Sequence, residues 1–183
     1  MNAQRLETSR LFQRFGFGPR PGEYAAALKN GVATTRTKLL TVPAVDAGAS
    51  QVVAPNITDL GQRPAPNSKE IVPFAIEMRF QVQQMTLWWL DRMAMSDHGL
   101  TERMTWFWHG HWATSVQKLN YAMPMYVQNN TLRANCLGNF KTMSRAMIND
   151  GALQFWLDGQ DSTLVQPNEN LGRELMELFV LGV

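Results

Sequence analysis

The sequence predicts an all-α protein, folded as an irregular multi-helix bundle with a long Pro/Ala-rich surface loop. Two observations lead to this class. Apolar residues recur at gaps of three and four over several stretches, and Gly, Pro and Asn residues separate those stretches as helix ends do. No stretch shows the regular alternation of a half-buried strand. At 183 residues with 45% hydrophobic residues, the chain is also long enough to bury a substantial core.

Residues 1–40 are predicted to form an N-terminal helical hairpin. An amphipathic pattern over 8–15 ends at a Gly-Phe-Gly-Pro sequence, which breaks helices. A second helix is expected over 22–30, because Gly31 stands where a helix C-cap would. A weaker helical pattern follows over 32–40.

Residues 41–68 are predicted to be a Pro/Gly/Ala-rich surface loop without regular structure. The segment has no useful periodicity, and its prolines are Pro43, Pro55, Pro64 and Pro66. A structureless stretch of this length is unusual inside a compact domain. We therefore expect it to run over the surface between the hairpin and the main body.

Residues 69–183 are predicted to form the main helical body. It opens near Pro73 with a long helix to about residue 95, whose apolar stripe is Ile71, Phe74, Met78, Val82, Met85, Trp89 and Met93. Another helix is expected from about residue 100, a helical region over 124–149, and a last helix over 167–181. Cys136 is the single cysteine, so no intrachain disulfide is possible, and we expect it to be a small core residue.

Two dense stretches carry the candidate chemistry. LTERMTWFWHGHWAT (100–114) holds two histidines among aromatic residues, and PNENLGRELMELFVLGV (167–183) holds three glutamates and an arginine. The candidate polar cluster is Glu102, His109, His111, Glu169, Arg173, Glu174 and Glu177. In a regular helix the two histidines point about 200° apart, since each residue turns by about 100°. His111 would then lie near Trp108 and Trp112.

Three interpretations of this cluster stay open. His109, His111 and Glu174 would be the ligands if a divalent transition metal is the cofactor. In the same catalytic interpretation, these groups could act as a general acid and base. A second interpretation is ligand binding without catalysis. In the structural alternative, the histidines hydrogen-bond buried carbonyl groups, and Arg173 pairs with Glu169 or Glu177 in an ion-pair network.

Several function classes lack their sequence signals. The net charge is +2 with dispersed Lys and Arg, so no nucleic-acid partner is expected. The sequence has no GxGxxG, P-loop, GxSxG or CxxC motif. The sequence contains no run of 18 apolar residues, so no membrane span is predicted. The first residues do not have the pattern of a signal peptide.

Four stretches together resemble the DUF1800 family of bacterial proteins. They are RLFQRFGFGPRPGEY, LWWLDRMAMSDHGLTERMTWFWHGHWATS, QNNTLRANCLGNFKTM and FWLDGQDSTLVQPNENLGRELMELFVLGV. The resemblance implies a largely helical protein of a family without an assigned function. It also implies that many members are exported and are encoded beside a second family, DUF1501. Because the family continues beyond the segment that ends this chain, we expect a truncated, N-terminal part.

Two functional hypotheses follow. The first is a partner-dependent or non-catalytic module of bacterial cell-envelope biology, working with a DUF1501-type neighbouring-gene product. An exposed apolar surface for the partner would be its mark. The alternative is a metal-dependent hydrolase or oxidoreductase that uses the His/Glu cluster. Its mark would be convergence of those side chains at about 2.0–2.2 Å from one ion.

Overall fold

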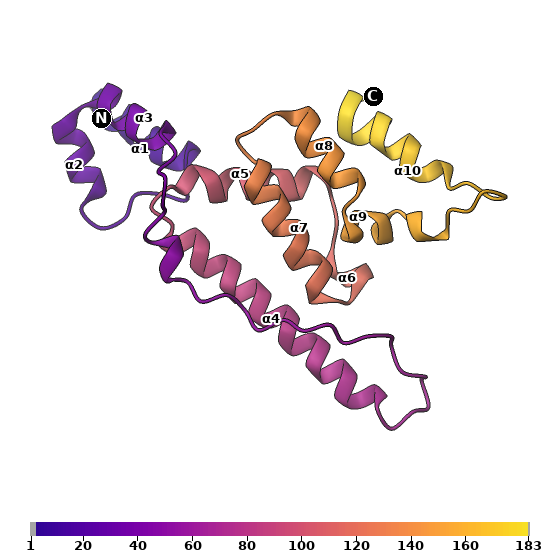
Figure 1. The fold of residues 1–183 in the computed structure, drawn as a ribbon. Coiled ribbons are helices and arrows are strands. Elements are labelled where there is room, and N and C mark those ends of the chain that lie inside the picture. The colour runs from indigo at the N-terminus through magenta and orange to yellow at the C-terminus, as the bar shows by residue number, and fades with distance from the viewer. Residues whose placement is uncertain (1–2, 183) are drawn as a thin grey trace. The chain divides into compact units, whose positions relative to one another are not determined.

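The computed structural model describes residues 3–182, and these residues form helices and loops without a strand (Figure 1). This confirms the all-α prediction. The chain divides into two compact units. Unit 1 comprises Met1–Ala54 and Trp88–Trp106, and unit 2 comprises Pro55–Leu87 and Phe107–Val183. Two of the three boundaries fall inside α4 (Ile71–Met95) and α5 (Gly99–His111), so both helices contribute to both units. The three-part division of the sequence stays a prediction.

In unit 1, α1 (Ala3–Arg14), α2 (Glu23–Asn30) and α3 (Val32–Leu40) pack against one another in pairs. The second and third lie where the sequence predicts them, because Gly31 adopts a φ of 85° between them and ends α2. The first helix begins earlier than the amphipathic pattern indicates. Its opening residues, AQRLE, are strong helix formers, so helix propensity extends it beyond the apolar stripe.

The second part of unit 1 includes the turn between α4 and α5. This turn is hydrogen-bonded to the segment around Asp46. The Asp46 carboxylate accepts hydrogen bonds from Ser96 Oγ at 2.5 Å and from the backbone N–H of Asp97 at 2.8 Å. It also accepts one from Ala49 N at 2.8 Å, which starts the short 3₁₀ turn η1 (Ala49–Gln51). We call this arrangement the Asp46 clasp. It joins residues about fifty positions apart in the sequence.

The clasp requires a glycine at position 48. A Cβ atom there would lie 1.9 Å from the carbonyl oxygen of Met95, which is far closer than any real contact. The Gly48 N–H also donates to Asp97 Oδ2 at 2.8 Å. Part of the predicted surface loop is therefore packed tightly against the end of α4.

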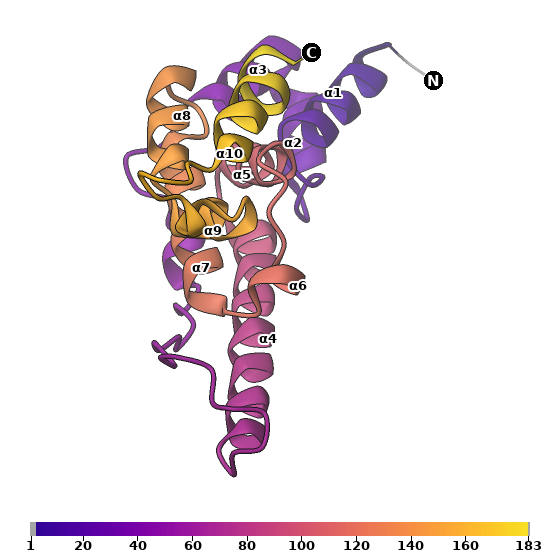
Figure 2. The same ribbon diagram turned by 90° about the vertical axis from the view of Figure 1, so that its right-hand side faces the viewer.

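In unit 2, the segment that precedes α4 runs back beside that helix (Figures 1 and 2). Gln81 Nε2 donates to Thr58 Oγ1 at 2.9 Å, and Gln84 Oε1 accepts from the Asn56 N–H at 3.2 Å. The side-chain amides of α4 thus provide hydrogen-bond partners for a backbone N–H and a hydroxyl of this segment, which has no regular backbone hydrogen bonds of its own.

The remaining helices of unit 2 surround a core of aromatic and aliphatic side chains. They are α6 (Val116–Leu119), α7 (Ala122–Asn135), α8 (Phe140–Ile148), α9 (Gly151–Trp156), η2 (Gly159–Asp161), α10 (Glu169–Glu174) and η3 (Leu175–Leu181). The buried core residues are Trp112, Leu132, Met143, Met147, Leu153, Leu157 and Phe179. Cys136 is buried, as predicted.

Two predicted helical regions differ from a single regular helix in the structure. The 124–149 region breaks before α8, because the Asn139 side chain accepts a hydrogen bond from Lys141 N at 2.9 Å and caps a new helix. The last helix begins after Asn168, whose side chain accepts from Asn170 N at 2.8 Å, and it changes from α10 to the π-helical η3. In the described part of the chain, no helix combines the length and apolar character that a membrane crossing needs.

Candidate functional site

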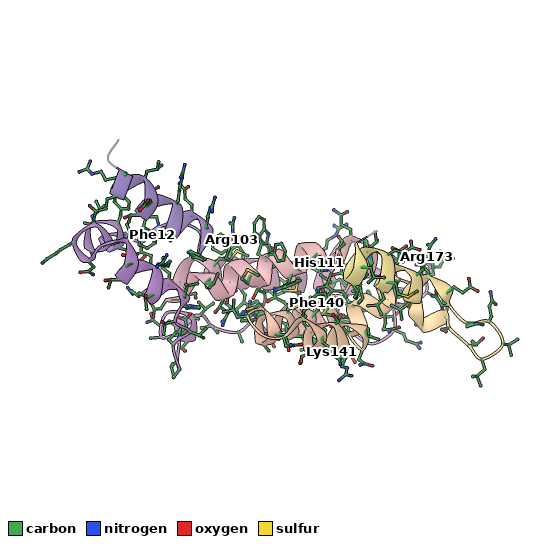
Figure 3. The ribbon with its side chains drawn as sticks, turned by 90° about the horizontal axis from the view of Figure 1, so that it is seen from above. Phe12, Arg103, His111, Phe140, Lys141 and Arg173 are labelled. Atoms are coloured by element: carbon green, nitrogen blue, oxygen red, sulfur yellow. The ribbon has the colours of Figure 1, made fainter. Side chains whose placement is uncertain are left out.

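His111 lies at the end of α5 inside a cage of aromatic rings in unit 2. Its ring contacts Trp108 and Trp112 edge-on, with centroids 5.4 and 5.6 Å away, as the helical spacing predicts. Phe140 of α8 and Phe179 of η3 complete the cage, each with its centroid 6.2 Å away. Figure 3 shows His111 at the end of α5, beside the C-terminal helix. Such edge-on geometry is favourable for aromatic pairs.

One hydrogen bond orients the His111 ring. Its Nε2 lies 2.8 Å from the carbonyl oxygen of Phe179. Because a carbonyl can only accept, Nε2 carries a proton and donates it. Carbonyl groups in the last turn of a helix lack partners within the helix, so His111 satisfies one of them from another element. A histidine that bonds a buried carbonyl is what the structural alternative expects, and His111 makes such a hydrogen bond; the role of the cluster stays a prediction.

His109 occupies the same turn of α5 in a different environment. Burial lowers the pKa of its imidazole below the ordinary value of 6.5, since the charged form is poorly solvated there. The ring is therefore mostly neutral at pH 7. A neutral imidazole can accept a proton or bind a metal, but it contributes no positive charge to the site.

Glu102 lies in unit 1, where it forms an ion pair with α4. Its Oε1 accepts from Arg92 Nε at 3.0 Å, and the Glu102 side chain is almost fully buried. The Arg92 guanidinium also lies 5.6 Å from the centre of the Trp88 ring. A buried carboxylate of this kind needs its partner, because an unpaired buried charge costs several kcal/mol, about 3–5. Glu102 is thus engaged in holding α4 and α5 together.

The C-terminal charged residues are mostly at the surface of unit 2. Arg173 Nη2 donates to Asn170 Oδ1 at 2.8 Å and lies 3.2 Å from Glu174 Oε1. Among the described residues these are its partners, in place of the predicted Glu169 and Glu177, and Figure 3 places Arg173 on the C-terminal helix. Glu169 and Glu177 are exposed, and Glu174 is half-buried.

The predicted cluster is thus distributed over different surroundings. Over residues 3–182, no group of three or more His, Cys, Asp or Glu side chains is placed to hold one metal ion. His109, His111 and Glu174 are therefore not gathered into a three-ligand centre. The metal site stays a prediction.

A buried polar chain in unit 2 was not predicted from the sequence. Thr114 Oγ1 donates to Gln128 Oε1 at 2.5 Å, and Gln128 Nε2 donates to Asp150 Oδ1 at 2.7 Å. Asp150 also caps α9 by accepting from Leu153 N at 3.0 Å. Burial raises the pKa of the Asp150 carboxyl above 3.8, despite these hydrogen bonds. The sequence motif Asn-Asp-Gly predicts only a helix stop at this position.

Unit 1 contains a cavity of about 300 Å³ beside the Asp46 clasp. The Gly-Phe-Gly-Pro-Arg segment and the turn between α4 and α5 line it. Arg20 reaches this turn, with Nη2 2.7 Å from Asp97 Oδ1 and 2.8 Å from the Ser96 carbonyl oxygen. The hydrogen bond from Arg20 lowers the pKa of Asp97. Among the described residues that line this cavity, Arg20 is the one cation, and it is already paired.

Fold and site together define an all-helical protein whose predicted polar residues are distributed rather than gathered. The chain matches the family model described as "Protein of unknown function (DUF1800)" over residues 10–183, and it belongs to this family. The resemblance predicted from its motifs is confirmed. Comparison with curated proteins and with solved structures gave no match.

Proposed function

We propose that this protein is a non-catalytic, partner-dependent helical module, and that a partner binds the uncovered apolar face of α4. The observation that carries the proposal is the exposure of large apolar side chains along this face. Val72 and Ile76 are each 63% exposed, Phe80 is 54% exposed and Leu87 is 52% exposed. We call these four residues the α4 face. All four belong to unit 2.

The spacing of the α4 face supports the proposal. Gaps of four, four and seven residues place these side chains within about 80° on one side of a helix that turns about 100° per residue. The predicted stripe, which includes Met78, Val82 and Met85, lies on the opposite side of the helix and is only partly exposed. A helix with apolar residues on both sides is typically buried on both. Single exposed apolar residues are normal, but an aligned set marks an interaction site.

Family membership supports the biological setting that we propose. The resemblance implies export of many members and a neighbouring gene of the DUF1501 type. We therefore propose a role in bacterial cell-envelope biology, with a DUF1501-type protein as the partner. The α4 face would supply the apolar contact, as a helix face does in helix-to-groove recognition.

Binding of purified DUF1501-type protein tests this proposal. The double variant Ile76→Ser, Phe80→Ser removes two half-exposed apolar side chains. Each should contribute about 1 kcal/mol on burial, so binding should weaken about 30-fold. Leu164→Ser is the matched control, because Leu164 is fully exposed in unit 2 and lies outside the α4 face. Equal affinity of the double variant and the wild type would overturn the proposal.

The metal-dependent alternative is supported by one observation in unit 2. The Phe179 carbonyl accepts from His111 Nε2, which leaves the Nδ1 lone pair of a neutral His111 for a ligand. Metal-binding histidines commonly donate their other nitrogen to a carbonyl in this way. Elemental analysis of protein prepared without chelator tests this function. It predicts a near-stoichiometric divalent transition metal that is lost in His109→Ala and in His111→Ala. Metal-free wild-type protein would contradict it.

A further inference from the structure

We propose that a groove between α4 and α6 in unit 2 binds the C-terminal residue of a peptide, with a free carboxylate and a leucine-sized apolar side chain. The groove has a volume of about 270 Å³. Its lining residues come from two short segments, Met78, Arg79, Val82 and Gln83 of α4 and Val116, Gln117 and Asn120 around α6. The groove borders the α4 face but shares none of its four residues, and the inference does not rest on the proposed function.

The floor of the groove is apolar. Met78, Val82 and Val116 supply it, and each of them is half-buried. One water-sized group takes up about 30 Å³, so the volume holds about nine such groups, comparable to the non-hydrogen atoms of a leucine residue with its terminal carboxylate. This volume is near the lower limit of small-molecule pockets, which start at about 300 Å³. The groove therefore suits one residue rather than a large cofactor.

The charge at the groove favours an anion. Arg79 is the one charged residue in its lining. In the described part of the chain, the Arg79 guanidinium makes no ion pair and no hydrogen bond. The helical positions that could pair with it hold Ala75, Ile76, Val82 and Gln83, none of them acidic. This differs from Arg20 in unit 1, which Asp97 already binds. A guanidinium binds a carboxylate through two parallel hydrogen bonds.

The rim suits a peptide more closely than it suits a simple fatty acid. Gln83, Gln117 and Asn120 surround the groove with carboxamides, which both donate and accept. Asn120 Nδ2 already donates to the Lys118 carbonyl at 3.1 Å, so its Oδ1 can accept the N–H of a bound residue. The side chains of Gln83 and Gln117 can donate to the carboxylate beside Arg79. Capture of a C-terminal carboxylate is an established mode of peptide recognition.

Titration with N-acetyl-leucine, followed by NMR of the backbone amides, tests this inference. We expect saturable shifts around the groove, with a Kd in the millimolar range for so small a ligand. N-acetyl-leucinamide lacks the carboxylate and should bind at least about tenfold more weakly, as should octanoate, which lacks the amide. Arg79→Gln should weaken N-acetyl-leucine by the same factor. Arg145→Gln, an exposed arginine on α8, is the matched control and should leave binding unchanged.

Three results would overturn the inference. One is the absence of saturable shifts up to about 10 mM ligand in folded protein. Another is equal binding of the acid and the amide, since that would remove the role of Arg79. The third is octanoate binding as tightly as N-acetyl-leucine, because the carboxamide rim would then contribute no hydrogen bond to the amide of the ligand. Ile76→Ser, Phe80→Ser replaces no residue that lines the groove, so this variant should still bind N-acetyl-leucine, and the two proposals fail independently.

Discussion

Replacing Asp46 by alanine should destabilise unit 1 strongly. The carboxylate accepts four hydrogen bonds, from Ser96 Oγ, Ala49 N, Asp97 N and His98 N. A hydrogen bond to a charged group contributes about 1.5–3 kcal/mol where it is buried. Asp46 is partly exposed, and water can reach some of the freed donors. We therefore expect a total loss of about 3 kcal/mol, out of a typical stability of about 5–15 kcal/mol.

Asp46→Asn separates the charge of this carboxylate from its hydrogen bonds. The asparagine oxygen can still accept from Ala49 N and Asp97 N, and its NH₂ group can donate to Ser96 Oγ, because a hydroxyl can reverse its role. His98 N keeps its second acceptor, Ser96 Oγ, at 3.2 Å. The loss should therefore be only about 1–2 kcal/mol.

The wild-type advantage over Asp46→Asn should depend on pH. Burial raises the pKa of Asp46, but hydrogen bonds from Ser96, Ala49, Asp97 and His98 outweigh it and hold the pKa below 3.8. The unfolded state therefore takes up a proton first as the pH falls. The advantage should be complete above pH 3.8 and should disappear as the pH falls through the lowered folded-state pKa.

Urea denaturation followed by circular dichroism, repeated from pH 7 to pH 2, measures both effects. A difference between wild type and Asp46→Asn that stays constant down to pH 2 would refute the role of the charge. A loss of less than about 0.5 kcal/mol in Asp46→Ala would refute the clasp itself, because that is the range of ordinary surface substitutions.

Three further predictions concern stability. Gly48→Ala should cost at least about 2 kcal/mol in urea denaturation, because the added Cβ meets the Met95 carbonyl, whereas Gly110→Ala meets nothing within 4 Å and should be neutral or stabilising. Asp150→Asn should gain stability relative to wild type as the pH rises from 3.8 to 7. Because the folded-state pKa of Asp150 is raised, its protonated carboxyl stabilises the folded protein fully below pH 3.8, and this stabilisation is lost as the pH rises through the folded-state pKa. Equal pH profiles of stability for the two proteins would contradict this. His111→Ala should cost about 2–4 kcal/mol, from a lost hydrogen bond and a cavity, and an unchanged melting temperature would contradict the caging of its ring.

The sequence predicts the helices wherever local signals determine them. The boundaries of α2 and α3 follow from Gly31, and the long helix α4 follows from its apolar spacing. Both signals act within a few residues, so they can be recognised without the fold. The break before α8 was not predicted, because an Asn cap after a Gly is a weak signal inside an apolar pattern. The change from α10 to the π-helical η3 was not predicted either.

The candidate site depends on contacts between distant residues, and here the sequence is less informative. The helical spacing correctly predicts that His111 lies near Trp108 and Trp112. It did not indicate that Arg92 pairs with Glu102. The Asp46 clasp joins positions about fifty residues apart across a segment with no periodicity, and no spacing rule connects them.

Hydrogen–deuterium exchange with a DUF1501-type partner is the most direct test of the α4 face. We expect the partner to slow exchange over residues 72–87. The exposed 163–167 loop of the same unit should be unaffected and serves as the internal reference. Protection that falls elsewhere, with residues 72–87 unchanged in the bound protein, would contradict the claim that this face holds the partner.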